Sequence, residues 1–189
     1  IWMIDLNRGL FKYDGVNVTR YRNKANDPNS LSSDRLECIT TSEDGIIWIG
    51  TFLNGLVRFD PIEETFVSYK HDDKNPNSIR SNSIRALITD KKGGLWIGTN
   101  VGLDYLNPDT GNFQHTFTNE PDEEMQQKEH IRELYIDKGG IIWIGCGSPF
   151  ISELTVGGLF RFDSDTKKVT RYTSNKNANS LIDNRIGAI

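Results

Sequence analysis

The chain has 189 residues, of which 36% are hydrophobic and 25% are charged, and its formal net charge at pH 7 is −4. These proportions are typical of a globular domain, and the length is near that of a single one. The acidic balance and the lack of a basic run argue against a nucleic-acid partner. No apolar run reaches the ~18 residues that would span a bilayer, so direct membrane insertion is not expected.

The two cysteines, Cys38 and Cys146, have no neighbours at metal-ligand spacing. We therefore predict no metal site and no cofactor, and we interpret both thiols as small buried hydrophobes. So few cysteines fit an exported protein as well as a cytosolic one. Ile1 stands inside a repeat, so we expect a piece of a longer protein whose targeting signals could lie outside it.

A turn followed by an apolar strand with a tryptophan recurs along the chain. Copies occupy residues 43–51, 90–99 and 137–145, and the end of another opens the chain at Ile1 and Trp2. The four tryptophans, 46, 48 and 47 residues apart, are Trp2, Trp48, Trp96 and Trp143. A fixed period in the forties that carries this pattern indicates a β-propeller.

Each repeat unit reads as four antiparallel strands, the content of one propeller blade. A strand precedes the Trp strand, and a Gly-Leu strand and a fourth strand follow it, with period-2 alternation typical of half-buried strands. We predict an all-β fold with about four blade equivalents in one propeller segment. The blades are residues 1–23 (lacking the first strand), 36–70, 84–118 and 131–173, and residues 186–189 begin another.

The Trp strands are apolar on consecutive residues, as in Ile46-Ile47-Trp48-Ile49, which is typical of a strand covered on both faces. Both faces of a propeller blade pack on neighbouring blades. The four tryptophans are therefore predicted to form the core between blades.

The spacing leaves two arrangements open. The strand that begins at residue 186 could pair beside residues 1–23 and close a four-bladed ring. We favour instead a segment of a larger propeller, whose exposed apolar blade faces would promote a homodimer.

The fourth unit breaks the repeat on the face that carries the long loops. Its loop after the Trp strand is longer, because Gly158 lies 15 residues after Trp143 whereas Gly55 lies 7 residues after Trp48. Insertions into a repeat often map to a binding face. Phe150 lies in this loop and could stack on a sugar or peptide, although a loop without a role is an equally good interpretation.

Polar residues at the start of the first strands are expected to line the channel mouth on the same face. A ring of polar groups suits an axial ligand, and it also suits any solvent-filled channel. Together with Phe150, the candidate ligand contacts are Glu129, His130, Arg132 and Arg185. Arg85 is expected just inside the mouth.

No catalytic site is predicted. The adjacent Glu129 and His130 are only a weak indication of acid–base chemistry. Motifs of a nucleophile elbow, a Walker loop or a zinc protease do not occur.

The combination of Asn-Ser-Leu/Ile, Asp-x-x-Gly-x-x-Trp-Ile-Gly-Thr and Gly-Leu-x-x-Phe-Asp-Pro resembles the two-component regulator propeller repeat. The resemblance covers essentially the whole chain. Thr51 and Thr99 match the final Thr of the family pattern, whereas Cys146 departs from it. Residues 2–5, Trp-Met-Ile-Asp, depart from it as well, so the first blade is atypical.

This resemblance implies a segment of a seven-bladed propeller in the periplasmic sensor of a Bacteroides-type hybrid two-component system. It also implies an oligosaccharide ligand and a histidine kinase elsewhere in the parent protein. Two other functions stay open. One is a propeller enzyme, a polysaccharide lyase or glycosidase, and the other is a structural module that only mediates dimerisation.

Overall fold

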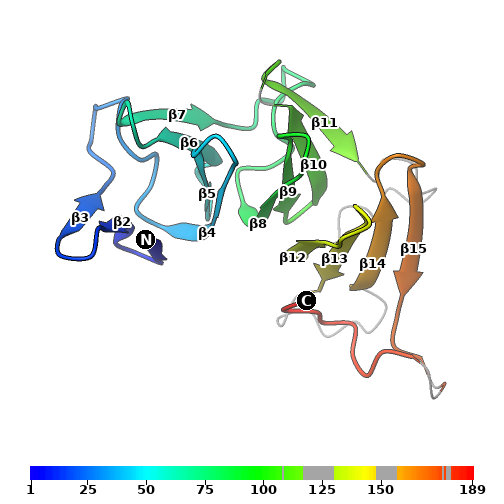
Figure 1. Cartoon of the computed structure of the whole chain (residues 1–189). Coiled ribbons are helices and arrows are strands. Elements are labelled where there is room, and N and C mark those ends of the chain that lie inside the picture. The colour runs from blue at the N-terminus through cyan, green and yellow to red at the C-terminus, as the bar shows by residue number, and fades with distance from the viewer. Residues whose placement is uncertain (108, 117–129, 148–156, 176, 178–179) are drawn as a thin grey trace.

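The computed structural model describes residues 1–107, 109–116, 130–147, 157–175, 177 and 180–189, and the regular elements in these ranges are all β-strands. The strands form four antiparallel sheets that follow one another as an open arc (Figure 1). Each sheet is an up-and-down meander in chain order, so the predicted all-β propeller architecture is confirmed. The described residues contain no helix of the length and apolarity that crossing a bilayer requires.

We number the sheets as blades 1 to 4. Blade 1 has three strands, β1 (Trp2–Asp5), β2 (Gly9–Tyr13) and β3 (Val18–Tyr21). Blade 2 consists of β4 (Leu36–Thr41), β5 (Ile47–Thr51), β6 (Leu56–Asp60) and β7 (Thr65–Tyr69). Blade 3 consists of β8 (Ile84–Thr89), β9 (Leu95–Thr99), β10 (Gly102–Asn107) and β11 (Asn112–Thr116). Blade 4 consists of β12 (Ile131–Ile136), β13 (Ile142–Cys146), β14 (Gly158–Asp163) and β15 (Lys168–Tyr172).

The spacing from Asp to Trp in the repeat motif has a direct structural cause. Asp90 accepts backbone N–H bonds inside its own turn with one carboxylate oxygen, and its other oxygen accepts the Trp96 indole N–H at 3.2 Å. Asp137 accepts the Trp143 indole N–H in the same way at 3.0 Å. The carboxylate therefore closes the turn and fixes the ring of the strand that follows.

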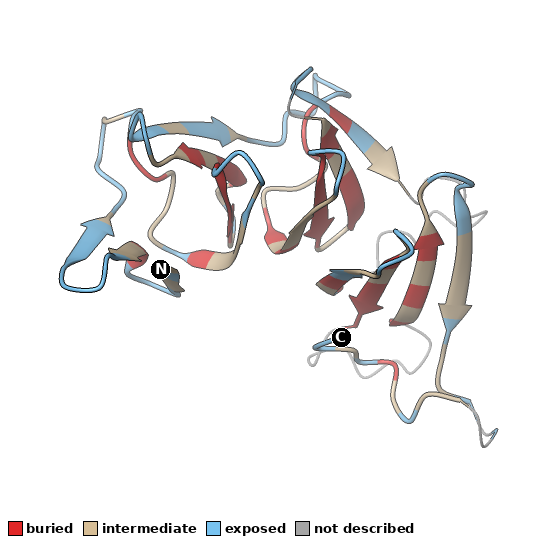
Figure 2. Ribbon diagram, viewed as in Figure 1, coloured by how far each residue is buried: buried red, intermediate tan, exposed pale blue. Residues whose placement is uncertain are grey.

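The hydrophobic core is divided into three clusters, each shared by two neighbouring blades. Figure 2 shows the buried positions concentrated on the middle strands of the blades. β5 and β9 are buried along their whole length, as expected for strands that are covered on both faces. Each blade thus completes the core of the next one.

The tryptophans fill these shared cores to different degrees. Trp48 and Trp96 are 2% and 4% exposed and pack against the blade that follows each of them. Trp2 is half-buried against Phe59 of blade 2. Trp143 differs from the predicted core role, because its half-buried ring stacks on Tyr172 of its own blade (6.2 Å between centroids) and no described sheet covers that face.

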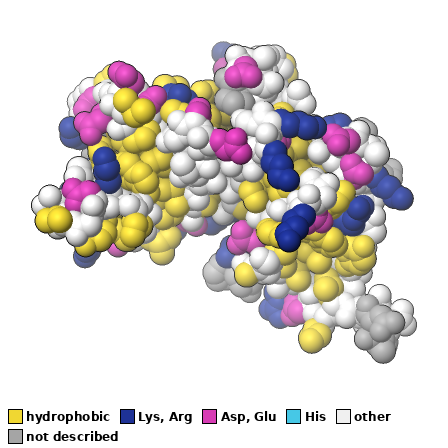
Figure 3. All heavy atoms as spheres, viewed as in Figure 1, with side chains coloured by type: hydrophobic (Ala, Val, Ile, Leu, Met, Phe, Trp, Pro, Cys, Tyr) yellow, Lys and Arg dark blue, Asp and Glu magenta, His cyan; other side chains and the backbone are white. Residues whose placement is uncertain are grey.

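The two ends of the arc expose apolar side chains (Figure 3). On blade 1 the strand register places Met3, Tyr13 and Val18 on the face away from blade 2, and all three are exposed. On blade 4 Tyr135 and Tyr172 are exposed. These surfaces correspond to the blade faces that elsewhere form the cores between blades, but here no described neighbouring blade covers them.

Residues 186–189 lie against blade 4, at the other end of the arc from blade 1 (Figure 1). The Ile186 N–H donates to the Cys146 carbonyl at 3.0 Å, and Ile186 packs over Gly145 as Ile84 packs over Gly50. The segment therefore lies where the inner strand of a following blade would begin, but it forms no strand. The four-bladed ring that the sequence left open is not what the structure shows.

Candidate functional site

The first strand of each complete blade lies on the inner side of the arc, where β8 contacts both β4 and β12. The three strands share one irregularity, a β-bulge after their first residue. The extra residue is Glu37 in β4, Arg85 in β8 and Arg132 in β12. A bulge redirects a side chain and interrupts pairing, and bulges are common beside functional sites.

The three bulged residues line one pocket of about 300 Å³ on the inner side of the arc, which we call the axial pocket. Arg85 donates to Glu37 at 3.2 Å, and their side chains are 24% and 18% exposed. Arg132 is exposed, and among the described residues no ion-pair partner is seen for it. The axial pocket thus combines one held guanidinium with one that faces solvent.

Two further groups contact the lining residues Glu37 and Arg85. Phe52 follows β5, and the guanidinium carbons of Arg35 and Arg85 lie 3.4 Å and 5.0 Å from the centre of its ring. Arg35 also reaches Glu37 at 3.9 Å. Cation–π contacts hold guanidinium groups in a defined plane. The Phe52 ring therefore orients Arg35 and Arg85 before any ligand is present.

His130 lies directly before β12 and belongs to the same environment. Burial lowers the pKa of the His130 imidazole, and the positive charges of Arg85 and Arg132 lower it further. The neutral ring can donate one hydrogen bond and accept another. Its backbone carbonyl accepts the Gly147 N–H at 3.0 Å, which ties the start of β12 to the end of β13.

The structure brings together only part of the predicted set. His130 and Arg132 lie close to Arg85, as expected for residues at one channel mouth. Arg185 follows the Asn184 segment of blade 4 and forms an ion pair with Asp183, and it does not line the axial pocket. Glu129 and Phe150 lie outside the described residues.

Sequence reasoning missed two members of the site. Glu37 lines the axial pocket and Phe52 packs against Arg85, and the sequence predictions included neither residue. The repeat itself held a signal for Phe52, because residues 100 and 147 occupy the same place after the Trp strand and neither is aromatic. In the described part of the chain, no group of three or more His, Cys, Asp or Glu could hold a metal ion.

Successive antiparallel meanders, with cores between the sheets and charged groups toward the axis, define the class of this chain, a segment of a β-propeller. The model of the two component regulator propeller family matches residues 78–101, which span the third Trp strand. This match confirms the resemblance that the repeat motif indicated. No curated protein sequence matches the chain.

Solved structures share this fold. The extracellular domain described as hybrid two component system BT4673 of B. thetaiotaomicron aligns with a TM-score of 0.76 and 24% identity over 99% of this chain. The extracellular domain described as hybrid two component system BT3049 of the same organism aligns with a TM-score of 0.61 and 20% identity over 97% of this chain. The chain spans 23% and 34% of these two proteins.

Virginiamycin B lyase from Staphylococcus aureus also aligns, with a TM-score of 0.64 and 15% identity over 95% of this chain and 53% of the lyase. At such identities the likeness shows the fold.

Proposed function

We propose that this chain is part of the extracytoplasmic sensor of a two-component regulator and that its axial pocket binds an oligosaccharide. The family match at residues 78–101 supports the regulator assignment. The similar structures that are described as extracellular domains of hybrid two component systems support the location. The observation that carries the ligand site is the repeated β-bulge, which delivers three charged side chains from three blades into one pocket.

The axial pocket favours a sugar with a negative substituent. Guanidinium groups bind carboxylate and sulfate through two parallel hydrogen bonds, and such charge-assisted bonds are stronger than neutral ones. Arg132 supplies the solvent-facing guanidinium, and Glu37 holds Arg85 in place beside it. Sugar hydroxyls can then bond to Glu37 and to the neutral His130 ring.

Binding at this pocket would involve three blades at once. A ligand can shift the relative population of two arrangements of a protein only if it binds them with different affinity. A site that is divided among β4, β8 and β12 meets this condition, because any change in blade packing changes its geometry. We propose that this coupling is the origin of the signal.

The test is calorimetric titration of the purified protein with oligogalacturonides and sulfated disaccharides. Arg85→Ala and Arg132→Ala should each weaken binding by at least about tenfold, because each removes a charge-assisted bond. Arg8→Ala is the matched control, since Arg8 is an exposed arginine in the β1–β2 turn of blade 1. Affinity should also fall as salt rises.

Three results would contradict the proposal in different ways. Unchanged binding in both pocket variants would remove the axial site. Release of unsaturated or shortened products from the titrated sugars would instead indicate the propeller enzyme. A folded protein that binds none of these sugars, but self-associates through its exposed blade faces, would favour the dimerisation module.

A further inference from the structure

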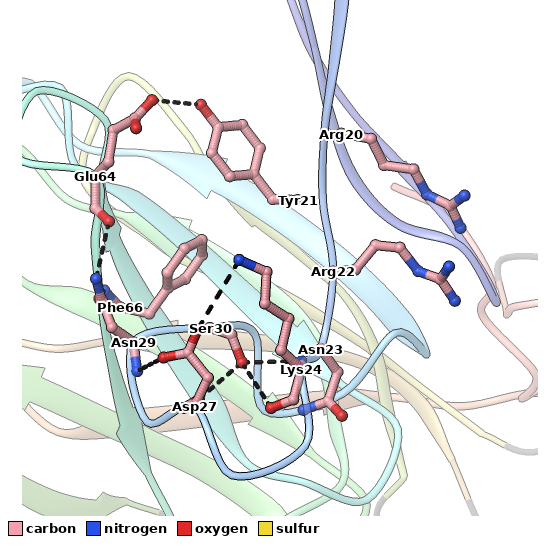
Figure 4. Close-up of a pocket in the computed structure, with 10 residues that line it drawn as sticks. All are labelled: Arg20, Tyr21, Arg22, Asn23, Lys24, Asp27, Asn29, Ser30, Glu64 and Phe66. Atoms are coloured by element: carbon pink, nitrogen blue, oxygen red, sulfur yellow. Dashed lines mark hydrogen bonds and ion pairs between the residues drawn. The ribbon is translucent and has the colours of Figure 1, made fainter.

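A second cavity, of about 530 Å³, lies at the outer edge of the arc between blade 1 and blade 2, and we call it the rim pocket (Figure 4). It is lined by the end of β3, the loop that follows it, Glu64 of the turn between β6 and β7, and Phe66 of β7. Its volume falls within the range of small-molecule sites in proteins. It shares no lining residue with the axial pocket.

One wall of the rim pocket is aromatic. The Phe66 ring stacks on Phe59 with its centroid at 4.3 Å and an interplanar angle of 14°, so one of its faces is occupied. Phe66 is half-buried and lines the pocket, and the Tyr21 ring lies tilted against it with 6.1 Å between the centroids. Tyr21 stands beside it and donates its hydroxyl hydrogen to Glu64 at 3.0 Å (Figure 4).

The lining also carries charged groups, among them Asp27, which accepts the Asn29 backbone N–H at 3.0 Å with one carboxylate oxygen. The Lys24 ammonium lies 3.9 Å from Asp27, and its side chain is 73% exposed. Glu64 uses one carboxylate oxygen for Tyr21, which leaves the second oxygen for a ligand. An ammonium donor and carboxylate acceptors beside an aromatic face can pair with the adjacent hydroxyls of a sugar, each of which both donates and accepts.

The turn between β6 and β7 positions the Glu64 side chain. The φ of Glu64 is 52°, in the left-handed region where a residue other than glycine costs free energy. The corresponding residues in blades 3 and 4 are Gly111 and Lys167, with φ 67° and 59°, so the left-handed conformation belongs to this turn in every complete blade. From this turn the Glu64 carboxylate reaches across the gap between the blades and accepts the Tyr21 hydroxyl.

The next gap between blades shows how the same space is closed. There His115 reaches the Pro76 carbonyl at 3.1 Å across the gap, and Phe113 is only 6% exposed. The residue at the position of His115 in blade 2 is Ser68, which is too short to make this contact. The gap between blades 1 and 2 thus lacks the bridge that His115 forms in the next gap.

We propose that the rim pocket is a second ligand site, which takes one neutral pyranose unit of a glycan. The apolar face of the sugar packs on Phe66, its hydroxyls donate to Glu64 and Asp27, and Lys24 donates to a ring or hydroxyl oxygen. This site is separate from the axial pocket and does not depend on the function proposed for that pocket.

The experiment is calorimetric titration of the purified protein with maltose, cellobiose, lactose and mannobiose. Ser68→His should close the cavity and reduce affinity for the bound disaccharide by at least about tenfold. Glu64→Gln should weaken binding to a similar extent, since it removes the charge but keeps the shape. Glu63→Gln is the matched control, because Glu63 is the exposed neighbour in the same turn and does not line the pocket.

Binding that is lost in the Ser68→His and Glu64→Gln variants, but kept in Glu63→Gln and in Arg85→Ala, would establish the rim site. Failure of all four disaccharides to bind would overturn the proposal. Binding that survives Ser68→His would overturn it as well. Both tested side chains are exposed, and circular dichroism and thermal melting of each variant separate a loss of binding from a loss of fold.

Discussion

Replacing Asp104 with valine should lower the free energy of unfolding by about 3 kcal/mol. The Asp104 carboxylate is 0% exposed and accepts bonds from the Arg80 backbone N–H and the His115 ring, each at 2.8 Å. The Arg80 guanidinium lies 3.4 Å from it. Removing one partner of a buried ionic group costs ~3–5 kcal/mol. We take the low end, since the Arg80 and His115 side chains keep 19% and 28% exposure.

Blade 2 offers a matched way to restore the stability. Val57 occupies the position of Asp104 there, and Ser32 and Ser68 occupy those of Arg80 and His115. The variant that carries Arg80→Ser, Asp104→Val and His115→Ser should therefore recover to within about 1 kcal/mol of the wild type, because replacing an entire buried ionic group is often neutral.

Urea-induced unfolding, followed by tryptophan fluorescence, measures both changes. The slope of the transition should stay constant, so that the shift in midpoint reports stability alone. A single variant that loses less than about 1 kcal/mol would refute the role of Asp104 as the centre of this network. A triple variant as unstable as the single one would refute the equivalence of the two blades.

Two further predictions follow from burial and charge. Trp96→Ala should cost ~3–5 kcal/mol in urea unfolding, and Trp143→Ala distinctly less, because only the first ring lies in a core between blades; equal losses would contradict this difference. The Ile79 carbonyl, and then Asp73, raise the pKa of His71 above 6.5, so its contribution to stability is full below that pH and is lost as pH rises through the folded pKa. NMR titration should show a raised His71 pKa in the wild type and a lower His71 pKa in the Asp73→Asn variant. Identical His71 titrations in the two proteins would show that the Asp73 carboxylate does not raise this pKa.

The sequence was sufficient for the architecture because its information is local and repeated. A strand that is apolar on consecutive residues has to be covered on both faces, and only a stack of sheets does this for β5 and β9 alike. The Asp-to-Trp spacing was visible as well, and the structure adds the indole hydrogen bond to Asp90 that explains it.

The site was less predictable because it depends on register and on contacts between blades. Arg132 lies between Ile131 and Glu133, and nothing in that pattern alone locates the bulge. The two arginines that flank Phe52 come from different blades, so no local pattern pairs them. In the same way the partner of Glu64, Tyr21, is 43 residues away in the sequence and belongs to another blade.

The division of the core among pairs of blades determines how a local defect spreads. Stability in such a chain behaves approximately as a sum of interfaces between nearest neighbours, and cooperativity decays with distance along the stack. Truncation of the Trp96 side chain weakens the interface between blades 3 and 4, because its ring is part of the core that these two blades share. Amide hydrogen exchange should therefore accelerate in β12 to β15 first, while β1 to β3, two interfaces away, keep their protection. The arc would unfold one blade at a time, starting at the weakened interface between blades 3 and 4.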